Sequence, residues 1–525
     1  MNTKETNPSK KDIWLFWGCF AALTATSFGF IVRTQVIGDW GVEFALSETQ
    51  KGEIFGVGLW PFCISIILFS LVIDKIGYGT SMMIALFLHV LSAIITIMAD
   101  GYWMLYWGTF ILALGNGTVE AAINPVVATI FSKEKTKWLN ILHAGWPAGL
   151  ALGGILAILM GPEVSWKWKV ALVLIPVVVY GVMLYGREFP VQERVKAGVS
   201  FKDMLSEAGA VGFFLIFYTV LLEINRVAGL TPLVESNFLS LPHVSLTLLL
   251  ILVSVGYYIY TNSLGRPLFI LLLLIMIPLA TTELGTDSWI TDLMVPFLGN
   301  NAGWVVVYTA MIMVILRFYA GPIVHRTSPL GLLAISSAIA LVGLIILSTA
   351  TGFMIFIAAT IYGLGKTFFW PTMLGVAGER FPKGGALTLN AITGVGMLAA
   401  GIFGTPFLGN IQDKQIDSQL LKQNPAIHAQ VMGQEQTSVF GKYNPLDQEK
   451  VSDLSSSDQA IIAEVQTASK QGALSTVAVF PGIMLICYLG MIGYFRSRGG
   501  YKAIDLSEDN SSTPQEDISI EGDKT

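Results

Sequence analysis

Long apolar runs recur along the whole chain and alternate with short polar stretches. A helix that spans a lipid bilayer needs about 20 mostly apolar residues. Fourteen runs have roughly this length, at 13–33, 50–73, 80–98, 103–131, 138–161, 168–186, 208–229, 244–261, 267–283, 303–321, 330–349, 353–377, 387–408 and 473–495. Backbone groups in lipid must bond within their own segment, so these runs predict helices rather than open strands. The pattern predicts an all-α membrane protein with about 14 transmembrane helices.

An internal repeat divides these helices into two sets. The stretch ALGNGTVEAAINPVVATIFSKEKTKWLNILHAGWPAGLALGG (113–154) resembles IYGLGKTFFWPTMLGVAGERFPKGGALTLNAITGVGMLAAGIFG (361–404), and a constant offset of 250 residues aligns 113–154 with 363–404. The matched residues are Gly115 with Gly365, Phe131 with Phe381, Lys133 with Lys383, Leu139-Asn140 with Leu389-Asn390, and Gly154 with Gly404. Two repeated bundles of this kind are typical of transporters, which bind the solute near the membrane midplane between them. We therefore expect two six-helix bundles, with 208–229 and 244–261 as an inserted pair.

The charges and polar segments orient this arrangement. Lys and Arg gather in alternate short loops, for example at Lys75, Lys133, Arg266 and Arg380, which places those loops in the cytoplasm. We expect both termini to be cytoplasmic and the protein to lie in the plasma (inner) membrane. The first apolar run is too long for the core of a signal peptide and has no clear cleavage site, so it should remain as the first span.

The expected organisation follows the chain in eight parts. These are a cytoplasmic N-terminus (1–12), an N-terminal six-helix bundle (13–186), a cytoplasmic loop (187–207), the two-helix insertion (208–263), the first five helices of a C-terminal bundle (264–408), an extracytoplasmic loop (409–471), the last transmembrane helix (472–496) and a cytoplasmic tail (497–525). The 409–471 segment is polar and should be partly ordered at best. The tail is acidic and rich in Ser, and it should be disordered.

The composition excludes several classes of function. Only 13% of the residues are charged, against about 25% in soluble domains. No basic surface suggests nucleic-acid binding. The paired glycines lie inside apolar helices and not after a strand, so they do not form a nucleotide site. No metal-ligand cluster or nucleophile motif occurs, and we expect neither an enzyme nor a cofactor. The expected partners are a small-molecule solute, protons and the lipid bilayer, with the protein as a monomer.

Two motifs resemble those of the major facilitator superfamily. SLVIDKIGYGTS resembles the inner-loop motif of that family, Gly-x-x-x-Asp-Arg/Lys-x-Gly-Arg/Lys-Arg/Lys: Asp74, Lys75 and Gly77 match, whereas Ser70 replaces the first Gly and Tyr78-Gly79 replace the basic pair. GNGTVEAAINP followed by LNILHAGWPAG is similar to the fucose/glucose–proton symporter group, whose members carry Gly-x-Gly-x-x-Glu-x-x-x-Asn-Pro and then Leu-Asn-x-x-His. The resemblance implies a proton-coupled sugar transporter.

Glu120 is the first candidate for chemistry, because a charged side chain at mid-membrane is costly and is usually kept for function. Asn116 and Asn124 lie four residues before and after it, so the three side chains should follow one side of a helix. A carboxyl group buried there could exchange a proton near neutral pH. The resemblance implies the same role, because the matching Glu of the symporters takes part in proton coupling. The alternative is an acid that only holds helices together.

Further charged residues occur at comparable depth. Lys366 is the repeat counterpart of Asn116 and needs a carboxylate partner, which we expect to be Glu120 or Glu283. Arg33 ends the first span, and its repeat counterpart is Glu283. Glu283 and Asp287 lie in the polar stretch TTELGTDSW, which predicts a broken helix beside a binding site. Arg33 also fits an interfacial position. The first span has no carboxylate, so the two-carboxylate relay of the fucose symporter group does not transfer directly.

Several neutral side chains complete the candidate site. Asn140 and His143 open the fifth predicted span, and Asn390 is the counterpart of Asn140. His143 can titrate in a useful range, although a His at a helix end is more often a structural hydrogen-bonding residue. Trp146 and Trp370 each precede a Pro inside a span. Such rings could stack on the C–H faces of a sugar, or they could simply pack the core.

A gate is expected away from the solute. Asp74 with Lys75, and Arg317 with Arg326, occupy the two equivalent inner loops in the repeat. They could pair across the two bundles and hold the inner side closed, or they could be solvated charges that only set the topology.

We thus expect a secondary active transporter that takes up a sugar or polyol with protons by alternating access. The alternatives are a carrier of another solute, such as an organic anion or a drug-like cation, and a non-transporting membrane sensor with the same fold. The deep charges are balanced, Arg33 and Lys366 against Glu120 and Glu283, which favours a neutral solute over an anion.

Overall fold

The computed structural model of the chain describes residues 9–44, 54–161, 163–227, 241–299, 302–438 and 441–506. Parts of four sequence predictions lie outside these residues: most of the N-terminus 1–12, the beginning of the span 50–73, the end of the span 208–229, and most of the tail 497–525.

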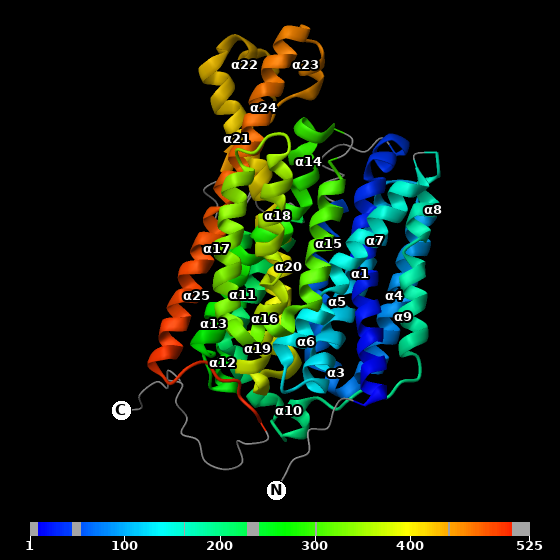
Figure 1. Cartoon of the computed structure of the whole chain (residues 1–525), viewed down its shortest axis with the longest axis vertical. Coiled ribbons are helices and arrows are strands. Elements are labelled where there is room, and N and C mark those ends of the chain that lie inside the picture. Colours follow the sequence, from blue (N-terminus) through cyan, green and yellow to red (C-terminus); the bar gives the residue numbers. More distant parts are fainter. Residues whose placement is uncertain are drawn as a thin grey trace.

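The described chain is almost entirely helical (Figure 1). In chain order the helices are α1 Lys10–Glu43, α3 Trp60–Ile76, α4 Tyr78–Ile97, α5 Tyr102–Ile130, α6 Lys135–Leu142, α7 Gly145–Met160, α8 Trp166–Ala171, α9 Leu174–Leu184, α10 Glu193–Lys196, α11 Phe201–Val227, α12 Leu241–Thr261, α13 Pro267–Ala280, η1 Thr281–Gly285, α14 Thr286–Leu298, α15 Trp304–Phe318, α16 Ala320–Thr327, α17 Pro329–Leu347, α18 Met354–Lys366, α19 Phe369–Arg380, η3 Pro382–Gly384, α20 Gly385–Leu398, η4 Ala399–Gly404, α21 Thr405–Gln423, α22 Pro425–Val431, α23 Gln448–Ser452, α24 Ser456–Val477 and α25 Val479–Ser497.

Two bundles lie side by side in Figure 1. We call α1 to α9 the N-terminal half and α13 to α25 the C-terminal half. The sequence repeat appears in the helix ends, since α5 is capped by Phe131 and α19 by Phe381, both with φ near −120° and ψ near +50°. We call the end of the bundle at which α1 begins and α25 ends the terminal end, and the opposite end the hairpin end (Figure 1).

The all-α membrane fold is confirmed, but the number of spans differs from the prediction. Among the described residues, twelve helices are long and apolar enough to cross a membrane, or thirteen if the bent pair α15 and α16 counts as one. The two parts of that pair meet at 66°. The other departure is the predicted span 353–377, which is divided into α18 and α19. The predicted count of about 14 is higher because it treats two broken segments, α15 with α16 and α18 with α19, as continuous spans.

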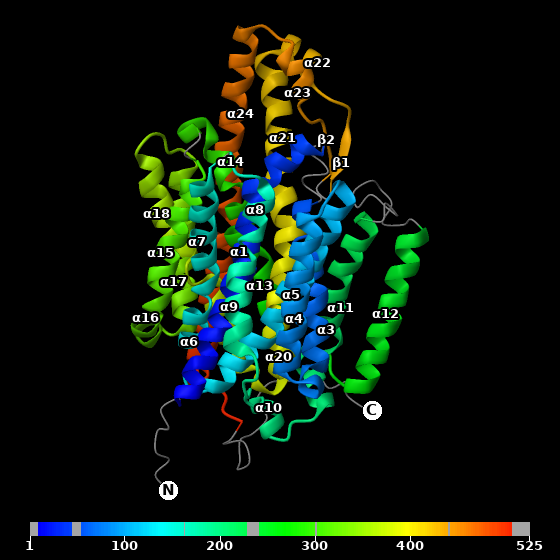
Figure 2. The same ribbon diagram turned by 90° about the vertical axis from the view of Figure 1, so that its right-hand side faces the viewer.

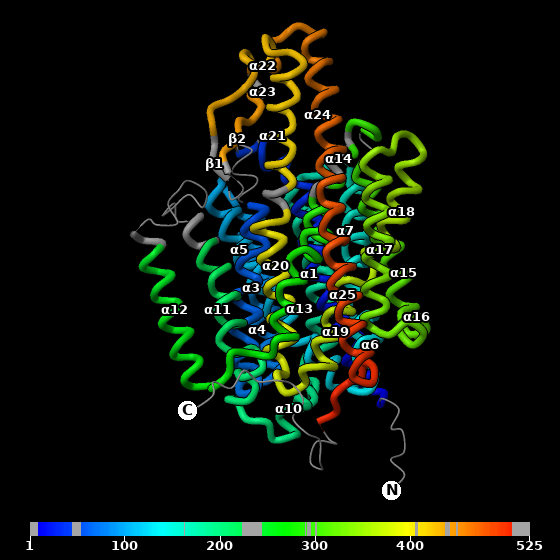
Figure 3. The backbone as a smooth tube through the Cα atoms, turned by 90° about the vertical axis from the view of Figure 1, so that its left-hand side faces the viewer, coloured from blue at the N-terminus to red at the C-terminus, as the bar shows by residue number. Residues whose placement is uncertain are grey.

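The two-helix insertion forms α11 and α12. Helix α11 packs on α12, α13 and α20, whereas α12 has α11 as its main neighbour and lies at the outside of the molecule (Figures 2 and 3). Only 6% of the α12 span is buried inside the protein. The exposed residues of α12 are apolar, among them Leu248, Leu252 and Ile259, as expected for a helix that faces lipid.

The polar segment 409–471 is more ordered than expected. Helices α21 and α24 extend from the hairpin end and carry α22, α23 and a two-stranded antiparallel sheet, β1 Gln436–Ser438 with β2 Gly441–Tyr443, in which Gln436 is opposite Tyr443 (Figure 1). This hairpin has a separate apolar core of Ile416, Leu420, Ile427, Val431, Ile462 and Val465. The prediction of partial order was wrong, because these widely spaced apolar residues meet only when the two long helices pair.

Close helix packing in the bundle depends on small residues. A Cβ atom added at Gly117 would lie 2.2 Å from Ser65 Oγ, and one at Gly365 would lie 2.4 Å from the backbone nitrogen of Ala340. These positions cannot hold a larger residue without moving a neighbouring helix. Gly77 has a different role: its φ of 83° ends α3 and begins α4, a conformation that favours glycine.

Candidate functional site

A small cavity lies between the two halves of the bundle. Its lining comes from both halves: Glu120, His143 and Trp146 on one side, and Glu283, Leu284, Arg317, Trp370 and Met397 on the other. The volume of the cavity is about 20 Å³. The cavity in this state therefore has room for water and not for a sugar-sized solute.

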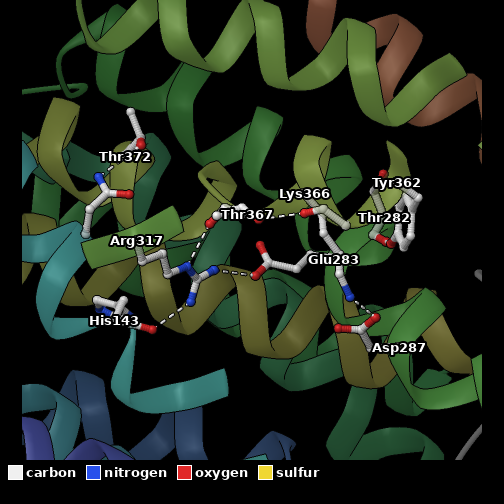
Figure 4. A network of polar contacts seen from close by, with 11 residues as sticks. His143, Thr282, Glu283, Asp287, Arg317, Tyr362, Lys366, Thr367 and Thr372 are labelled. Atoms are coloured by element: carbon white, nitrogen blue, oxygen red, sulfur yellow. Dashed lines mark hydrogen bonds and ion pairs between the residues drawn. The ribbon is translucent and has the colours of Figure 1, made fainter. Parts of the chain in front are cut away.

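Arg317 on α15 connects the two halves at this cavity (Figure 4). Its side chain is 1% exposed, and each guanidinium nitrogen donates to a different acceptor. Nε donates to the carbonyl of Thr367 at 2.7 Å, Nη1 to the carbonyl of His143 at 2.7 Å, and Nη2 to Glu283 Oε1 at 3.0 Å. The planar fork of Arg suits three acceptors in fixed directions.

The two carbonyl acceptors exist because of proline. Proline has no N–H, so the carbonyl four residues before it loses its helical donor. Pro147 leaves the carbonyl of His143 without a donor, and Pro371 does the same for Thr367. Arg317 supplies both missing donors. The two Trp-Pro pairs thus create the breaks between α6 and α7 and between α18 and α19, and Arg317 bonds to both breaks.

Glu120 belongs to a polar chain on the other wall of the cavity. Its side chain is 3% exposed, and Asn124 Nδ2 donates to Glu120 Oε2 at 3.3 Å. Asn124 Oδ1 lies 3.0 Å from His143 Nε2. Among the described residues, no cation forms an ion pair with Glu120. An acid that is buried without a counter-charge at a solute cavity is a candidate for proton exchange.

Lys366 forms an ion pair with Asp287, and its Nζ also lies 5.1 Å from the centre of the Tyr362 ring (Figure 4). The expectation of Glu120 or Glu283 as the partner was wrong, because Arg317 already binds Glu283. Asp287 follows η1, the π-helical turn that interrupts the polar stretch TTELGTDSW. Tyr362 Oη donates to the carbonyl of Thr282 in this turn at 2.5 Å, which fixes the interruption against α18.

The two tryptophans line the cavity from opposite halves. Trp370 on α19 is 6% exposed, and its ring lies so close to Gly396 that a Cβ there would be 2.5 Å from it. Trp146 on α7 is partly buried and lies 6.1 Å from the Phe30 ring, centre to centre.

Asn140 and Asn390 join the halves rather than line the cavity. Asn140 Nδ2 donates to Thr372 Oγ1 at 3.1 Å, and Asn390 Nδ2 donates to Ser70 Oγ at 2.8 Å and to the carbonyl of Ala121 at 3.1 Å. The Ala121 carbonyl is again four residues before a proline, Pro125.

The terminal end is closed by polar contacts between α6 and α19. Thr136 Oγ1 donates to Glu379 Oε1 at 2.5 Å, and Lys135 Nζ donates to the Gly378 carbonyl at 3.2 Å. Nearby, Glu134 lies 3.1 Å from His325 of the other half. Burial alone would raise the pKa of Glu134, but hydrogen bonds and charges from Lys137 and His325 outweigh it, so the pKa lies below its ordinary value. We call these contacts the terminal latch.

The gating pairs proposed from the sequence differ from the observed ones. Arg317 is not in a loop, and Asp74 pairs with Arg194 beside α10. Lys75 and Arg326 are exposed. The sequence prediction placed Arg317 in an inner loop. In the structure α15 is short and bends where α16 begins, and Arg317 lies in the last turn of α15.

Asn116 and Arg33 lie away from this cavity. Asn116 Oδ1 accepts from His89 Nε2 at 3.0 Å inside the N-terminal half. The expected stripe is therefore divided, because Asn116 bonds to His89 whereas Asn124 bonds to Glu120. Each step of four residues turns about 40° around a helix, and two steps are enough to separate the ends of the stripe. Arg33 lines a second cavity.

Some residues of the site were not identified from the sequence. Leu284 and Met397 gave no usable signal, because apolar residues look ordinary in a helix. Glu379 lies near the end of a helix, where a charged residue also looks ordinary. For Thr367 a signal did exist: Pro371, four residues later, predicts an unsatisfied carbonyl.

Comparisons with known proteins agree with this architecture. The sequence model of the Major Facilitator Superfamily matches residues 14–405. A search of curated proteins finds no match. The fucose:proton symporter FucP of E. coli, in its outward conformation, has a TM-score of 0.54 at 15% identity and covers 90% of this chain and 99% of its own. The proton:xylose symporter XylE has a TM-score of 0.59 at 14% identity, with 90% and 96% covered. The human organic anion transporter MFSD10 has a TM-score of 0.57 at 10% identity, with 91% and 99% covered.

At these identities the solved structures show a common fold and not a common solute. The family match covers all the helices that line the central cavity, from α5 to α20. The chain belongs to the major facilitator superfamily, and it is an integral membrane protein with the transporter fold of that family.

Proposed function

We propose that the protein couples the uptake of a sugar or polyol to protons, by alternating access to the cavity between its halves. The observation that carries this proposal is Glu120, a buried carboxyl group that faces the cavity and has no cation partner among the described residues. In this mechanism Glu120 binds the proton, which alters its hydrogen bond with Asn124. Asn124 also bonds to His143, so the position of His143 responds to the protonation of Glu120. The carbonyl of His143 contacts Arg317, so protonation on one half influences a contact with the other.

The remaining lining supports a neutral, ring-shaped solute. Trp146 and Trp370 offer one aromatic ring from each half, suitable for the C–H faces of a sugar, while carboxylates in the lining can accept from hydroxyl groups. Arg317 is neutralised by Glu283 and Lys366 by Asp287, so the cavity lacks the positive excess that an anion would need. FucP and XylE are described as sugar:proton symporters, which is consistent with this solute class. MFSD10 is described as an organic anion transporter, so an anion remains the main rival.

The mechanism requires the helices to separate, because the cavity is too small for a sugar in this state. With cytoplasmic termini in the plasma (inner) membrane, as we propose, the terminal latch closes the cytoplasmic side. Solute would then enter from the hairpin end and leave after Thr136 and Glu379 separate.

Glu120→Gln tests the coupling. In proteoliposomes we expect it to abolish sugar accumulation driven by a pH gradient, because Gln cannot exchange a proton. Exchange of labelled for unlabelled sugar, which needs no net proton movement, should continue in this variant. Glu188→Gln is the matched control, since Glu188 is exposed and distant from the cavity.

Proton-driven accumulation by Glu120→Gln equal to that of the unmodified protein would show that Glu120 does not couple transport. If both the unmodified protein and Glu120→Gln exchange organic anions but no sugar or polyol, the proposed solute class is wrong. The coupling role of Glu120 is then tested in the same way, with an organic anion as the solute.

A further inference from the structure

A second cavity lies inside the N-terminal half, away from the interface between the halves. It is lined by α1, α4, α5 and the region of α8 and α9, through Gly29, Val32, Arg33, Trp40, His89, Ser92, Ala93, Thr96, Thr109, Leu112, Val170 and Val173. Its volume is about 30 Å³. Rocking of the two halves does not open it directly, because no lining residue comes from the C-terminal half.

Arg33 contributes an unneutralised charge to this cavity. It is 5% exposed, and its Nε is buried without a hydrogen-bond partner among the described residues. The guanidinium carbon lies 5.7 Å from the centre of the Phe30 ring and 5.8 Å from that of Phe55. A Cβ added at Gly58 would be 2.3 Å from Nη1, so the guanidinium group lies close against the backbone at Gly58.

Two acidic residues described near this end of α1 bind other partners. Asp39 pairs with Lys169 at 3.7 Å, and Glu43 accepts a hydrogen bond from Trp166. In the part of the chain that the structure describes, no carboxylate forms an ion pair with Arg33. Arg317 shows the usual arrangement, in which a buried arginine has an acidic partner. A buried cation without one is unfavourable, because neither water nor an opposite charge compensates it.

Trp40 provides a second, independent signal in the same cavity. It follows Arg33 by seven residues, two helical turns, and so lies on the same face of α1. Trp40 is 1% exposed, and its Nε1 has no acceptor among the described residues. An indole N–H is only a donor, as is a guanidinium group. The two unsatisfied groups therefore require the same kind of ligand, an acceptor.

The remaining polar groups agree with this requirement. Both ring nitrogens of His89 are already bonded, Nδ1 to Tyr180 Oη at 2.9 Å and Nε2 to Asn116 Oδ1 at 3.0 Å. Thr96 and Thr109 bring hydroxyl groups, which can donate to an anion. The residues that line the cavity include no acid.

We propose that this cavity binds a small monovalent anion, of the size of chloride or formate, beside Arg33 and Trp40. The narrow interior excludes larger anions such as sugar phosphates. Arg33 lies ten residues before the end of α1, about 15 Å along the helix, so the anion has a short way from the solution at the hairpin end. The site would stabilise the N-terminal half and is separate from the solute cavity.

Thermal unfolding of the purified full-length protein in detergent tests the proposal. Sodium chloride or sodium formate replaces sodium gluconate at constant ionic strength, because gluconate is too large for the cavity. We expect at least one of the small anions to raise the Tm in a saturable way, as a ligand of the folded state does. The two titrations also show whether a halide or a small carboxylate binds better.

Two variants locate the effect. Arg33→Gln should abolish the saturable response, whereas Arg326→Gln, which changes an exposed arginine, should retain it. Trp40→Phe keeps an aromatic ring but lacks the N–H, and it should raise the half-saturating concentration by about tenfold, the effect of one lost hydrogen bond to a charged group.

The proposal is overturned if neither small anion differs from gluconate, or if Arg33→Gln responds as the unmodified protein does. If Arg33→Gln does not fold, Trp40→Phe and bromide decide the matter. Anomalous scattering from bromide in crystals should give a peak beside Arg33, and bromide peaks only at other places would contradict the site.

Discussion

At the residue scale, Arg317 is the connection between the two halves. Its three donors serve a carbonyl in each half and a carboxylate, at 2.7, 2.7 and 3.0 Å. The charge is balanced by Glu283, whose second oxygen, Oε2, is buried without a partner among the described residues. A buried pair of this kind contributes little net stability compared with apolar residues, but removing one member leaves an uncompensated charge. Arg317 therefore acts more on the geometry of the cavity than on overall stability.

Arg317→Gln should lower the free energy of unfolding by about 3–5 kcal/mol, because Glu283 remains buried without its partner. Glu283→Gln should have a similar effect, and the double variant should cost less than the sum of the two. Thermal or denaturant unfolding in detergent measures this double-mutant cycle. Strictly additive effects would show that the two residues are not coupled.

Arg317→Lys is expected to abolish transport while it preserves much of the stability. Lysine retains the charge, but its single nitrogen cannot reach three acceptors that lie in different directions. Uptake in proteoliposomes, with Arg326→Lys as the exposed control, measures the effect. Normal uptake by Arg317→Lys would mean that charge alone is sufficient.

At the element scale, proline determines where the halves meet. Pro125, Pro147 and Pro371 each remove one donor from a helix, and each freed carbonyl accepts from a side chain on another helix. Two of these hydrogen bonds cross between the halves: Asn390 to Ala121, and Arg317 to His143. The carbonyls that proline frees are therefore also attachment points of the bundle.

Pro371→Ala should reduce the transport rate by about tenfold without lowering the Tm. The new N–H of residue 371 can bond to the Thr367 carbonyl, straighten the junction of α18 and α19, and compete with Arg317 Nε. Weakening one such charge-assisted bond by about 1.4 kcal/mol corresponds to a factor of ten.

Pro176→Ala provides the control for this variant. Pro176 lies in the first turn of α9, where the backbone N–H groups have no helical acceptor. We expect it to transport normally, and an equal loss in both variants would show that the effect of Pro371 is not local.

At the scale of the whole molecule, the contacts between the halves are polar at the terminal end and apolar towards the hairpin end. The terminal latch is polar, with Thr136 bound to Glu379 and Lys135 to the Gly378 carbonyl. Beyond the cavity, towards the hairpin end, α7 and α15 meet through an apolar cluster that includes Leu150, Ala151, Val307 and Ala310. Polar contacts that water can replace are suited to opening and closing, whereas the apolar contact can act as a pivot.

Glu379→Gln should shift the protein toward the state that is open at the terminal end. The neutral amide is a weaker acceptor for the Thr136 hydroxyl and backbone N–H than a carboxylate is. The readout is the rate at which a thiol reagent modifies Thr372→Cys, a buried position behind the latch, with the native cysteines replaced.

We expect this rate to rise several-fold in Glu379→Gln and to remain unchanged with Glu188→Gln. An unchanged rate in Glu379→Gln would show that the latch does not limit access from the terminal end.

The sequence alone was sufficient for the fold, for physical reasons that act locally. Twenty-residue apolar runs have only one stable form in lipid, and the repeat at an offset of 250 residues requires two similar bundles. Glu120, His143, Trp146, Glu283 and Trp370 were also selected as candidates from the sequence, because polar or aromatic side chains are conspicuous in an apolar helix, and in the structure they line the central cavity.

The tertiary structure decided which partner each side chain has. Asp287 rather than Glu120 or Glu283 neutralises Lys366, and Arg317 pairs with Glu283 at the cavity rather than with a residue of an inner loop. Arg33 lies in a cavity of its own. Spacing along a helix predicts the face on which a residue lies, but pairing depends on how helices distant in the sequence rotate and approach one another. That arrangement is set by small residues such as Gly117 and by the proline breaks, and only the assembled bundle reveals it.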